Sequence, residues 1–102
     1  MLTDKQLNAA VTVGSKVKFE CASNKTVDMC WSHCCIFGLI YNGMTLKREY
    51  QQRYAVTTTN NGGSTVSTLT INPVKMEDAR SLCCSECDTS IAAAAAHLVV
   101  IC

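Results

Sequence analysis

The side chains best suited to chemistry in this sequence are its eight cysteines among 102 residues, since a thiol can form a disulfide or, as a thiolate, bind a metal. Four of them form two matched pairs. The residue numbers of Cys30 and Cys87 add to 117, and so do those of Cys34 and Cys83. Two antiparallel strands in one register would place each pair face to face, with all four side chains on one face of a sheet. The spacing therefore predicts the disulfides Cys30–Cys87 and Cys34–Cys83.

The neighbouring Cys84 has the opposite parity, so its side chain is expected to point into the core, where Cys21 can meet it. Zinc is the alternative for Cys84-x-x-Cys87, because this spacing is common among zinc ligands; further candidate ligands would be Cys30, His33, Cys34 and Cys35. However, alternation along a strand sends Cys84 and Cys87 to opposite faces, whereas one ion needs convergent ligands. We therefore expect structural cross-links and no metal site.

Two cysteines are left over by this scheme. Cys35 and Cys102 can form a disulfide with each other near one end of the domain, or Cys102 can link to another chain. The spacing does not choose between these alternatives, because eight cysteines allow 105 pairings.

Composition limits the class of protein. A chain of this length with 48% hydrophobic residues is expected to be a single domain, residues 1–102. Its cysteine content is typical of an extracellular, disulfide-linked domain. The net charge of +1 argues against nucleic acid as a partner and against direct contact with a membrane. No apolar run reaches membrane-spanning length, and the first residues lack the features of a signal peptide.

Short segments with alternating or β-branched residues predict the strands that position the cysteines. Val11, Val13, Val17, Phe19 and Cys21 alternate as inward-facing positions, with a bend at residues 14–15. Further strands are expected at residues 29–35, 39–41, 54–59, 65–71, 82–87 and 98–101, with turns at residues 42–43 and 60–63. The alanines at residues 92–96 favour a helix by propensity, but the β-rich run that follows predicts the start of a last strand. Eight or nine short strands indicate an all-β, two-sheet sandwich.

The order of these residues resembles that of a variable-type immunoglobulin domain over residues 10–101. The resemblance rests on two motifs, Val13-Gly14-x-x-Val17-x-Phe19-x-Cys21 followed by Trp31, and Leu69-x-Ile71-x-x-Val74-x-x-x-Asp78-Ala79 followed by Cys84. It implies a Greek-key sandwich, in which the two disulfides predicted from the cysteine spacing would be additional bonds between strands C and F. It also implies a register in which the residue before the tryptophan lies opposite the third residue after the second cysteine.

Specific pairs follow from the resemblance. It implies an inter-sheet disulfide between Cys21 and Cys84 with Trp31 packed against it, and an ion pair between Arg53 and Asp78. The sequence also departs from the family: Leu82 replaces the tyrosine of the tyrosine corner. Alanines replace the glycine-rich segment that shapes the pairing face of antigen receptors, which argues against a conventional antibody-like heterodimer.

The resemblance implies a binding role. We expect the sheet of strands G, F, C and C′ to bind another protein at the cell surface, either a second copy or a different partner. The expected contact residues are Ser32, Ile36, Phe37, Tyr41 and Ser85. Binding of a small molecule or glycan, and a purely structural spacer, are the alternatives.

The remaining expectations concern modification, location and catalysis. Asn24 begins an Asn-Lys-Thr glycosylation sequence in a polar loop. The domain is expected to be the N-terminal, extracellular part of a single-pass receptor. No catalytic residues and no cofactor are expected, since no catalytic set has convincing spacing.

Overall fold

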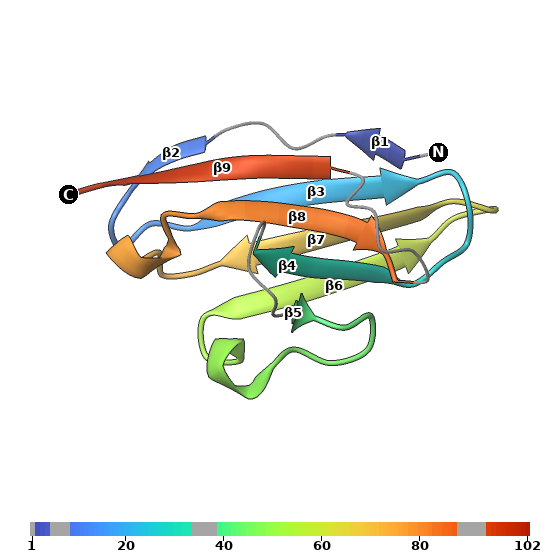
Figure 1. Cartoon of the computed structure of the whole chain (residues 1–102), viewed down its shortest axis with the longest axis horizontal. Coiled ribbons are helices and arrows are strands. Elements are labelled where there is room, and N and C mark those ends of the chain that lie inside the picture. Colours follow the sequence, from blue (N-terminus) through green and yellow to red (C-terminus); the bar gives the residue numbers. More distant parts are fainter. Residues whose placement is uncertain (1, 5–8, 34–38, 88–93) are drawn as a thin grey trace.

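Two β-sheets packed face to face make up the computed structural model, which describes residues 2–4, 9–33, 39–87 and 94–102 (Figure 1). One sheet has the order β1-β3-β7-β6 and the other the order β2-β9-β8-β4-β5. The strands of the first are β1 (Leu2–Asp4), β3 (Val17–Ser23), β7 (Thr65–Ile71) and β6 (Tyr54–Asn60). Those of the second are β2 (Ala9–Thr12), β9 (Ala94–Ile101), β8 (Ser81–Glu86), β4 (Met29–His33) and β5 (Leu39–Tyr41). Two short 3-10 helices, η1 (Arg48–Tyr50) and η2 (Met76–Asp78), lie in the connections. The predicted all-β, two-sheet sandwich is confirmed.

The N-terminal segment crosses from one sheet to the other. β1 pairs antiparallel with β3, whereas β2 pairs parallel with β9. Gly14 follows β2 with a φ of 91°, a conformation that glycine adopts without steric cost, and the chain turns there into β3. This segment therefore contributes a strand to each layer.

The core between the sheets follows the predicted alternation. In β3, Val17, Phe19 and Cys21 are buried, and in β7 Leu69 and Ile71 are fully buried. Val13 departs from the prediction, because it follows the end of β2 and its side chain is 44% exposed. The inward pattern therefore holds only inside the strands, where pleating imposes it.

The register between β4 and β8 differs from the prediction by two residues. Cys30 lies opposite Ser85, and Trp31 lies opposite Cys84. Cys30 and Cys87 are therefore diagonal neighbours and do not face each other. Because side chains alternate with a period of two, a shift of two residues leaves every side chain on its predicted face. The face assignment was correct and the expected opposition was wrong.

The alanine-rich segment enters a strand as predicted. β9 begins at Ala94, which pairs with Cys84 of β8. Alanine is a good helix former, but pairing of Ala94, Ala95 and Ala96 with β8 overrides that weak preference.

Cys102 requires a correction. Its thiol is free and exposed, so the disulfide with Cys35, one of the two alternatives left open by the sequence, is not formed. It follows the end of β9, and its thiol donates to the sulfur of Met76 in η2 at 3.6 Å. Cys35 itself lies outside the described residues.

Candidate functional site

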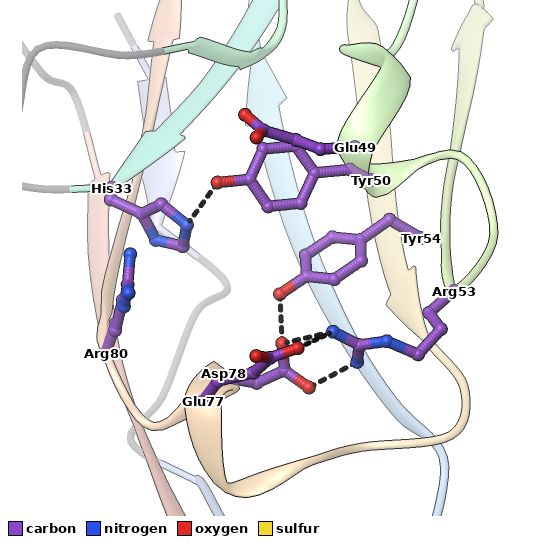
Figure 2. Close-up of a pocket in the computed structure, with 8 residues that line it drawn as sticks. All are labelled: His33, Glu49, Tyr50, Arg53, Tyr54, Glu77, Asp78 and Arg80. Carbon is purple, nitrogen blue, oxygen red and sulfur yellow. Dashed lines mark hydrogen bonds and ion pairs between the residues drawn. The ribbon is translucent and has the colours of Figure 1, made fainter.

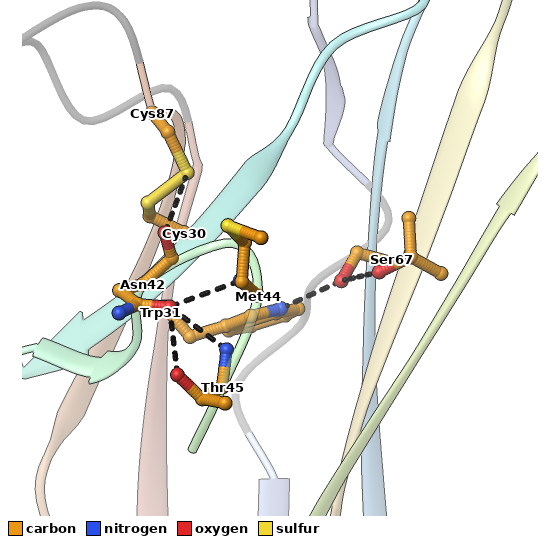
Figure 3. Close-up of a disulfide and its surroundings, with 8 residues drawn as sticks. Cys30, Trp31, Asn42, Met44, Thr45, Ser67 and Cys87 are labelled. Atoms are coloured by element: carbon orange, nitrogen blue, oxygen red, sulfur yellow. Dashed lines mark hydrogen bonds between the residues drawn. A yellow bond between two sulfur atoms is a disulfide. The ribbon is translucent and has the colours of Figure 1, made fainter. Parts of the chain in front are cut away.

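The Cys30–Cys87 disulfide cross-links β4 to the segment just after β8, with the two Cα atoms 5.2 Å apart (Figure 3). The N–H of Cys87 also donates to the carbonyl of Asp28 at 2.8 Å, which continues the β4–β8 ladder by one position. Cys83 is disulfide-bonded as well; its predicted partner, Cys34, lies outside the described residues. The Cys30–Cys87 bond therefore ties β4 to the chain that leaves β8.

The turn after β5 packs directly on this disulfide. The Sγ atom of Cys87 lies 3.6 Å from the carbonyl oxygen of Asn42 (Figure 3). Gly43 has a φ of 96°, and a Cβ atom at this position would lie 2.8 Å from the same sulfur. The Asn42 side chain closes the turn by accepting hydrogen bonds from the N–H groups of Met44 and Thr45, at 2.9 and 2.8 Å. The predicted Asn-Gly turn therefore has two reasons for its glycine, the backbone conformation and the nearby sulfur.

The outer face of the five-stranded sheet, which we call the front face, has small polar residues at its centre and apolar residues on both sides. Ser32 of β4 and Ser85 of β8 are half-buried at the centre. Leu39 on β5 is 44% exposed, and on β9 Val99 is 44% and Ile101 52% exposed. Because side chains alternate along β9, Val99 and Ile101 lie on the outer face of the sheet, and the buried Leu98 and Val100 lie on its inner face.

Tyr41 lies on the same strand as Leu39 and is half-buried, with part of its side chain against the core. The structure thus brings three of the five expected contact residues, Ser32, Tyr41 and Ser85, onto the front sheet. The other two, Ile36 and Phe37, lie outside the described residues.

The inner side of this sheet is rigidly attached to the opposite sheet. Cys21 and Cys84 form the inter-sheet disulfide, and Trp31 is fully buried. The indole N–H of Trp31 donates to Ser67 Oγ of β7 at 2.9 Å (Figure 3). A buried hydrogen bond and a covalent bond therefore both hold the front sheet in place.

A second polar cluster surrounds the buried carboxylate of Asp78 at one end of the sandwich (Figure 2). Arg53 donates to both of its oxygens, from Nη1 to Oδ2 at 2.6 Å and from Nη2 to Oδ1 at 3.2 Å. The Tyr54 hydroxyl donates to Oδ1 at 2.5 Å, and the N–H of Lys75 donates to Oδ2 at 2.7 Å. Arg53 also contacts Glu77 at 2.9 Å. The sequence pointed to Arg53 and Asp78 but missed Tyr54, whose position next to the arginine was the available signal.

Burial and hydrogen bonding act in opposite directions on this cluster. Burial alone would raise the pKa of Asp78, but hydrogen bonds from Arg53, Tyr54 and the Lys75 N–H outweigh it and hold the pKa below its usual value. Burial, followed by the hydrogen bond to Asp78, raises the pKa of Tyr54 far above its usual value. At neutral pH Asp78 is therefore an ionised carboxylate, and both of its oxygens accept hydrogen bonds.

His33 lies beside this cluster and is buried. Its Nε2 is 3.2 Å from the Tyr50 hydroxyl, and the Tyr50 ring packs edge-on against Tyr54 with centroids 4.9 Å apart. Burial and the positive charge of Arg80 lower the pKa of His33. These side chains line a pocket of about 260 Å³, in which cationic and anionic groups largely compensate one another (Figure 2).

The loop between β3 and β4 carries the exposed Asn24. Next to it, Ser23 donates to the buried Glu86 at 2.9 Å and Lys25 lies 3.5 Å from the same carboxylate. The sequence does not mark Glu86 as a buried residue, because nothing in its local pattern distinguishes it from an exposed glutamate. Among the described residues, no three His, Cys, Asp or Glu side chains are grouped as a metal site.

Comparison with solved structures identifies the fold. A crystal structure of Dpr2 Ig1-Ig2 in complex with DIP-Theta Ig1-Ig3 matches with a TM-score of 0.74 at 18% sequence identity. The match covers 99% of this chain and 32% of the other, so the chain spans about a third of the length of the protein it resembles. No protein-family model and no curated protein matches the sequence.

The chain therefore has an immunoglobulin-like fold, with two sheets, the Cys21–Cys84 disulfide and the additional Cys30–Cys87 disulfide. Because 1479 chains of solved structures match this fold, the fold alone does not select a function. In the part of the chain that the structure describes, no helix is long and apolar enough to cross a membrane.

Proposed function

We propose that this chain is an extracellular recognition domain that binds another protein through the front face. The observation that carries the proposal is the position of Leu39, Val99 and Ile101, each about half exposed, on one face of a cross-linked sheet. Exposed apolar side chains around a rigid centre suit protein contact, because they are desolvated on binding without ordering a flexible surface. The Ig-domain neighbour, itself solved in a protein–protein complex, supports this class of function.

Within this proposal, the first partner to test is a second copy of the chain. A net charge of +1 produces little repulsion between copies. The corresponding biological role is adhesion or self-recognition by an immune-type receptor, in which this chain is the N-terminal domain of a single-pass membrane protein. The disulfides support an extracellular location, because such bonds persist in oxidising compartments.

The decisive experiment compares apolar-to-charged variants on and off the front face. In sedimentation across a concentration series, Val99→Asp and Leu39→Asp should weaken the front-face contact at least tenfold, because each buries a carboxylate in that interface. The series is run in a Thr58→Pro background, so that pairing of copies through the edge strand β6 does not contribute. Met76→Asp is the matched control, since Met76 is 50% exposed but lies on η2. Beads coated with the domain test the same contact multivalently.

Outcomes separate the alternatives. In the same Thr58→Pro background, bead aggregation abolished by Val99→Asp but not by Met76→Asp would support homophilic recognition through the front face. Beads that never aggregate, even at high coating density, would reject the homophilic form. Screening against other extracellular proteins then tests the wider proposal; a spacer would show no partner sensitive to Val99→Asp.

We also propose that Asn24 carries an N-linked glycan, because it is exposed in the loop between β3 and β4. The domain secreted from a eukaryotic host should then show a mass increase that peptide N-glycosidase removes. Thr26→Ala should abolish the increase, and Thr45→Ala, at another exposed threonine, should not. A wild-type domain of unmodified mass would contradict this assignment.

A further inference from the structure

The longest open strand edge of the described residues belongs to β6 (Figure 1). β6 is the last strand of the four-stranded sheet and has seven residues. The other outermost strands are shorter, with three residues in β1, four in β2 and three in β5. An open edge presents unpaired N–H and C=O groups that can pair with another strand.

The register with β7 decides which backbone groups of β6 face outward. Just before the strand, the N–H of Asn72 donates to the carbonyl of Arg53 at 2.8 Å. Just after it, the N–H of Asn61 donates to the carbonyl of Ser64 at 2.9 Å. Hydrogen-bonded pairs alternate along an antiparallel ladder, so the odd-numbered residues between these points bond to β7. The N–H and C=O groups that point away from β7 are those of Tyr54, Val56, Thr58 and Asn60.

Nothing in the described part of the chain covers these groups. Neither a backbone group nor a side chain of the described residues hydrogen-bonds to them. The side chains of residues 57–60 are all exposed.

Devices that normally protect an edge are also missing from β6. The strand reads Tyr-Ala-Val-Thr-Thr-Thr-Asn, with no charged residue and no proline. Its register with β7 is continuous, so no bulge twists the edge away. β-branched residues such as its threonines favour the extended conformation.

We infer that β6 pairs antiparallel with β6 of a second copy, so that two four-stranded sheets join into one of eight strands. The partner is a second copy because an uncharged strand does not repel itself, and because a two-fold axis lets each edge satisfy the other and closes the assembly at a dimer. If Val56 lies opposite Thr58 of the partner subunit, the outward-facing N–H and C=O groups of all four residues in each strand can form hydrogen bonds across the dimer. In that register Thr57 lies opposite Thr57 of the partner subunit. This contact involves the four-stranded sheet, whereas the front face belongs to the five-stranded sheet.

Two variants at the edge test the inference by sedimentation equilibrium. Thr58→Pro removes an outward N–H and leaves the bonds to β7 in place, since proline is tolerated at edge positions. Thr57→Lys places two lysines opposite each other across the two-fold axis. Each should raise the dimer dissociation constant at least tenfold. Thr68→Lys is the matched control, because Thr68 lies opposite Thr57 on the inner strand β7 and should change it less than twofold.

Charge complementation gives a second, independent measurement. In a Val99→Asp background, which removes the front-face contact, Thr57→Lys and Thr57→Glu should each be monomeric alone and should form a heterodimer when mixed. Circular dichroism checks that every variant is folded, and the front-face variant Val99→Asp should still dimerise through β6. This last result separates failure of the edge contact from failure of the front face.

Hydrogen exchange identifies the strand directly. The amides of Val56, Thr58 and Asn60 should gain protection as protein concentration rises, whereas those of Ala55, Thr57 and Thr59 should be protected at every concentration. A wild-type domain that is monomeric at millimolar concentration would overturn the inference. So would a dimer that Thr58→Pro and Thr57→Lys leave unchanged.

Discussion

At the scale of single residues, the most demanding group in the fold is the carboxylate of Asp78, which is 3% exposed. A buried charge is tolerated only when it is paired and hydrogen-bonded. Arg53, Tyr54 and the Lys75 N–H together satisfy it. The Asp78 side chain therefore ties the η2 connection to the start of β6.

Removing one hydrogen-bond donor to Asp78 should lower the free energy of unfolding. Tyr54→Phe deletes the hydroxyl and keeps the ring, which leaves the Asp78 carboxylate short of one hydrogen bond. We expect a loss of about 1.5–3 kcal/mol in the free energy of unfolding, the usual range for a hydrogen bond to a charged group. Urea denaturation measures it. Tyr41→Phe, at a half-buried tyrosine of the front sheet, is the control, and an equal loss in both variants would contradict the assignment.

His33 gives the domain a pH dependence of defined sign. Its pKa in the folded state is below the usual value of 6.5, because of burial and the charge of Arg80. Below pH 6.5 the unfolded chain takes up the proton more readily than the folded chain does. The contribution of His33 to stability is therefore present above pH 6.5 and is lost as the pH falls through the lowered pKa.

Thermal unfolding at pH values between 7.5 and 5 tests this dependence. The melting temperature of the wild type should fall with pH over this interval, and His33→Gln should flatten the curve. His97→Gln is the control, because His97 is exposed. Asp78 acts at lower pH: its pKa is also lowered, so its contribution is lost only below about pH 4. An unchanged slope in His33→Gln would refute the role of His33.

At the scale of strands, the Cys30–Cys87 bond shows that two cysteines on neighbouring strands can form a disulfide without lying directly opposite each other. The two residues are diagonal neighbours across β4 and the end of β8, yet their Cα atoms are 5.2 Å apart, within the normal range. Cysteine spacing therefore predicted the bond and the face of the sheet correctly, although it misplaced the ladder by two residues. The position of each hydrogen bond depends on neighbouring strands, which the spacing does not contain.

The energetic value of this bond depends on the disulfide beneath it. Cys21–Cys84 already joins the two segments, so Cys30–Cys87 closes an additional ring of only about a dozen residues, for which the chain-entropy estimate is roughly 3 kcal/mol. We expect Cys30→Ala/Cys87→Ala to lower the free energy of unfolding by about 2–3 kcal/mol. Guanidinium denaturation measures this loss. The comparison requires that the double variant is folded and keeps the Cys21–Cys84 disulfide. A loss below about 0.5 kcal/mol would show that the bond adds nothing to the inter-sheet disulfide.

At the scale of the whole molecule, the two proposed contact surfaces belong to different sheets. The front face lies on the five-stranded sheet, and the β6 edge closes the four-stranded one. Among the described residues, Val99 and Thr58 share no hydrogen-bonding or strand-pairing partner. A molecule that used both surfaces could extend into larger assemblies without any change in the domain itself.

Independence of the surfaces is measurable. In a double-mutant cycle, Val99→Asp and Thr58→Pro should have additive effects on the unfolding free energy of the monomer, within about 0.5 kcal/mol. Denaturation at a concentration where every variant is monomeric measures this. A larger coupling energy would mean that the two sheets transmit changes to each other through the core.

The sequence by itself determined the all-β class, the inward and outward faces of the strands, the Asn42-Gly43 turn and the disulfides of Cys21 and Cys30. Each depends on a local period or a spacing, which pleated strands preserve through any even shift. Only the tertiary structure decided the β4–β8 register, the participation of Tyr54 and Glu86, the free thiol of Cys102 and the open edge of β6. These depend on which segments become neighbours, and that outcome depends on packing of the entire core between the two sheets.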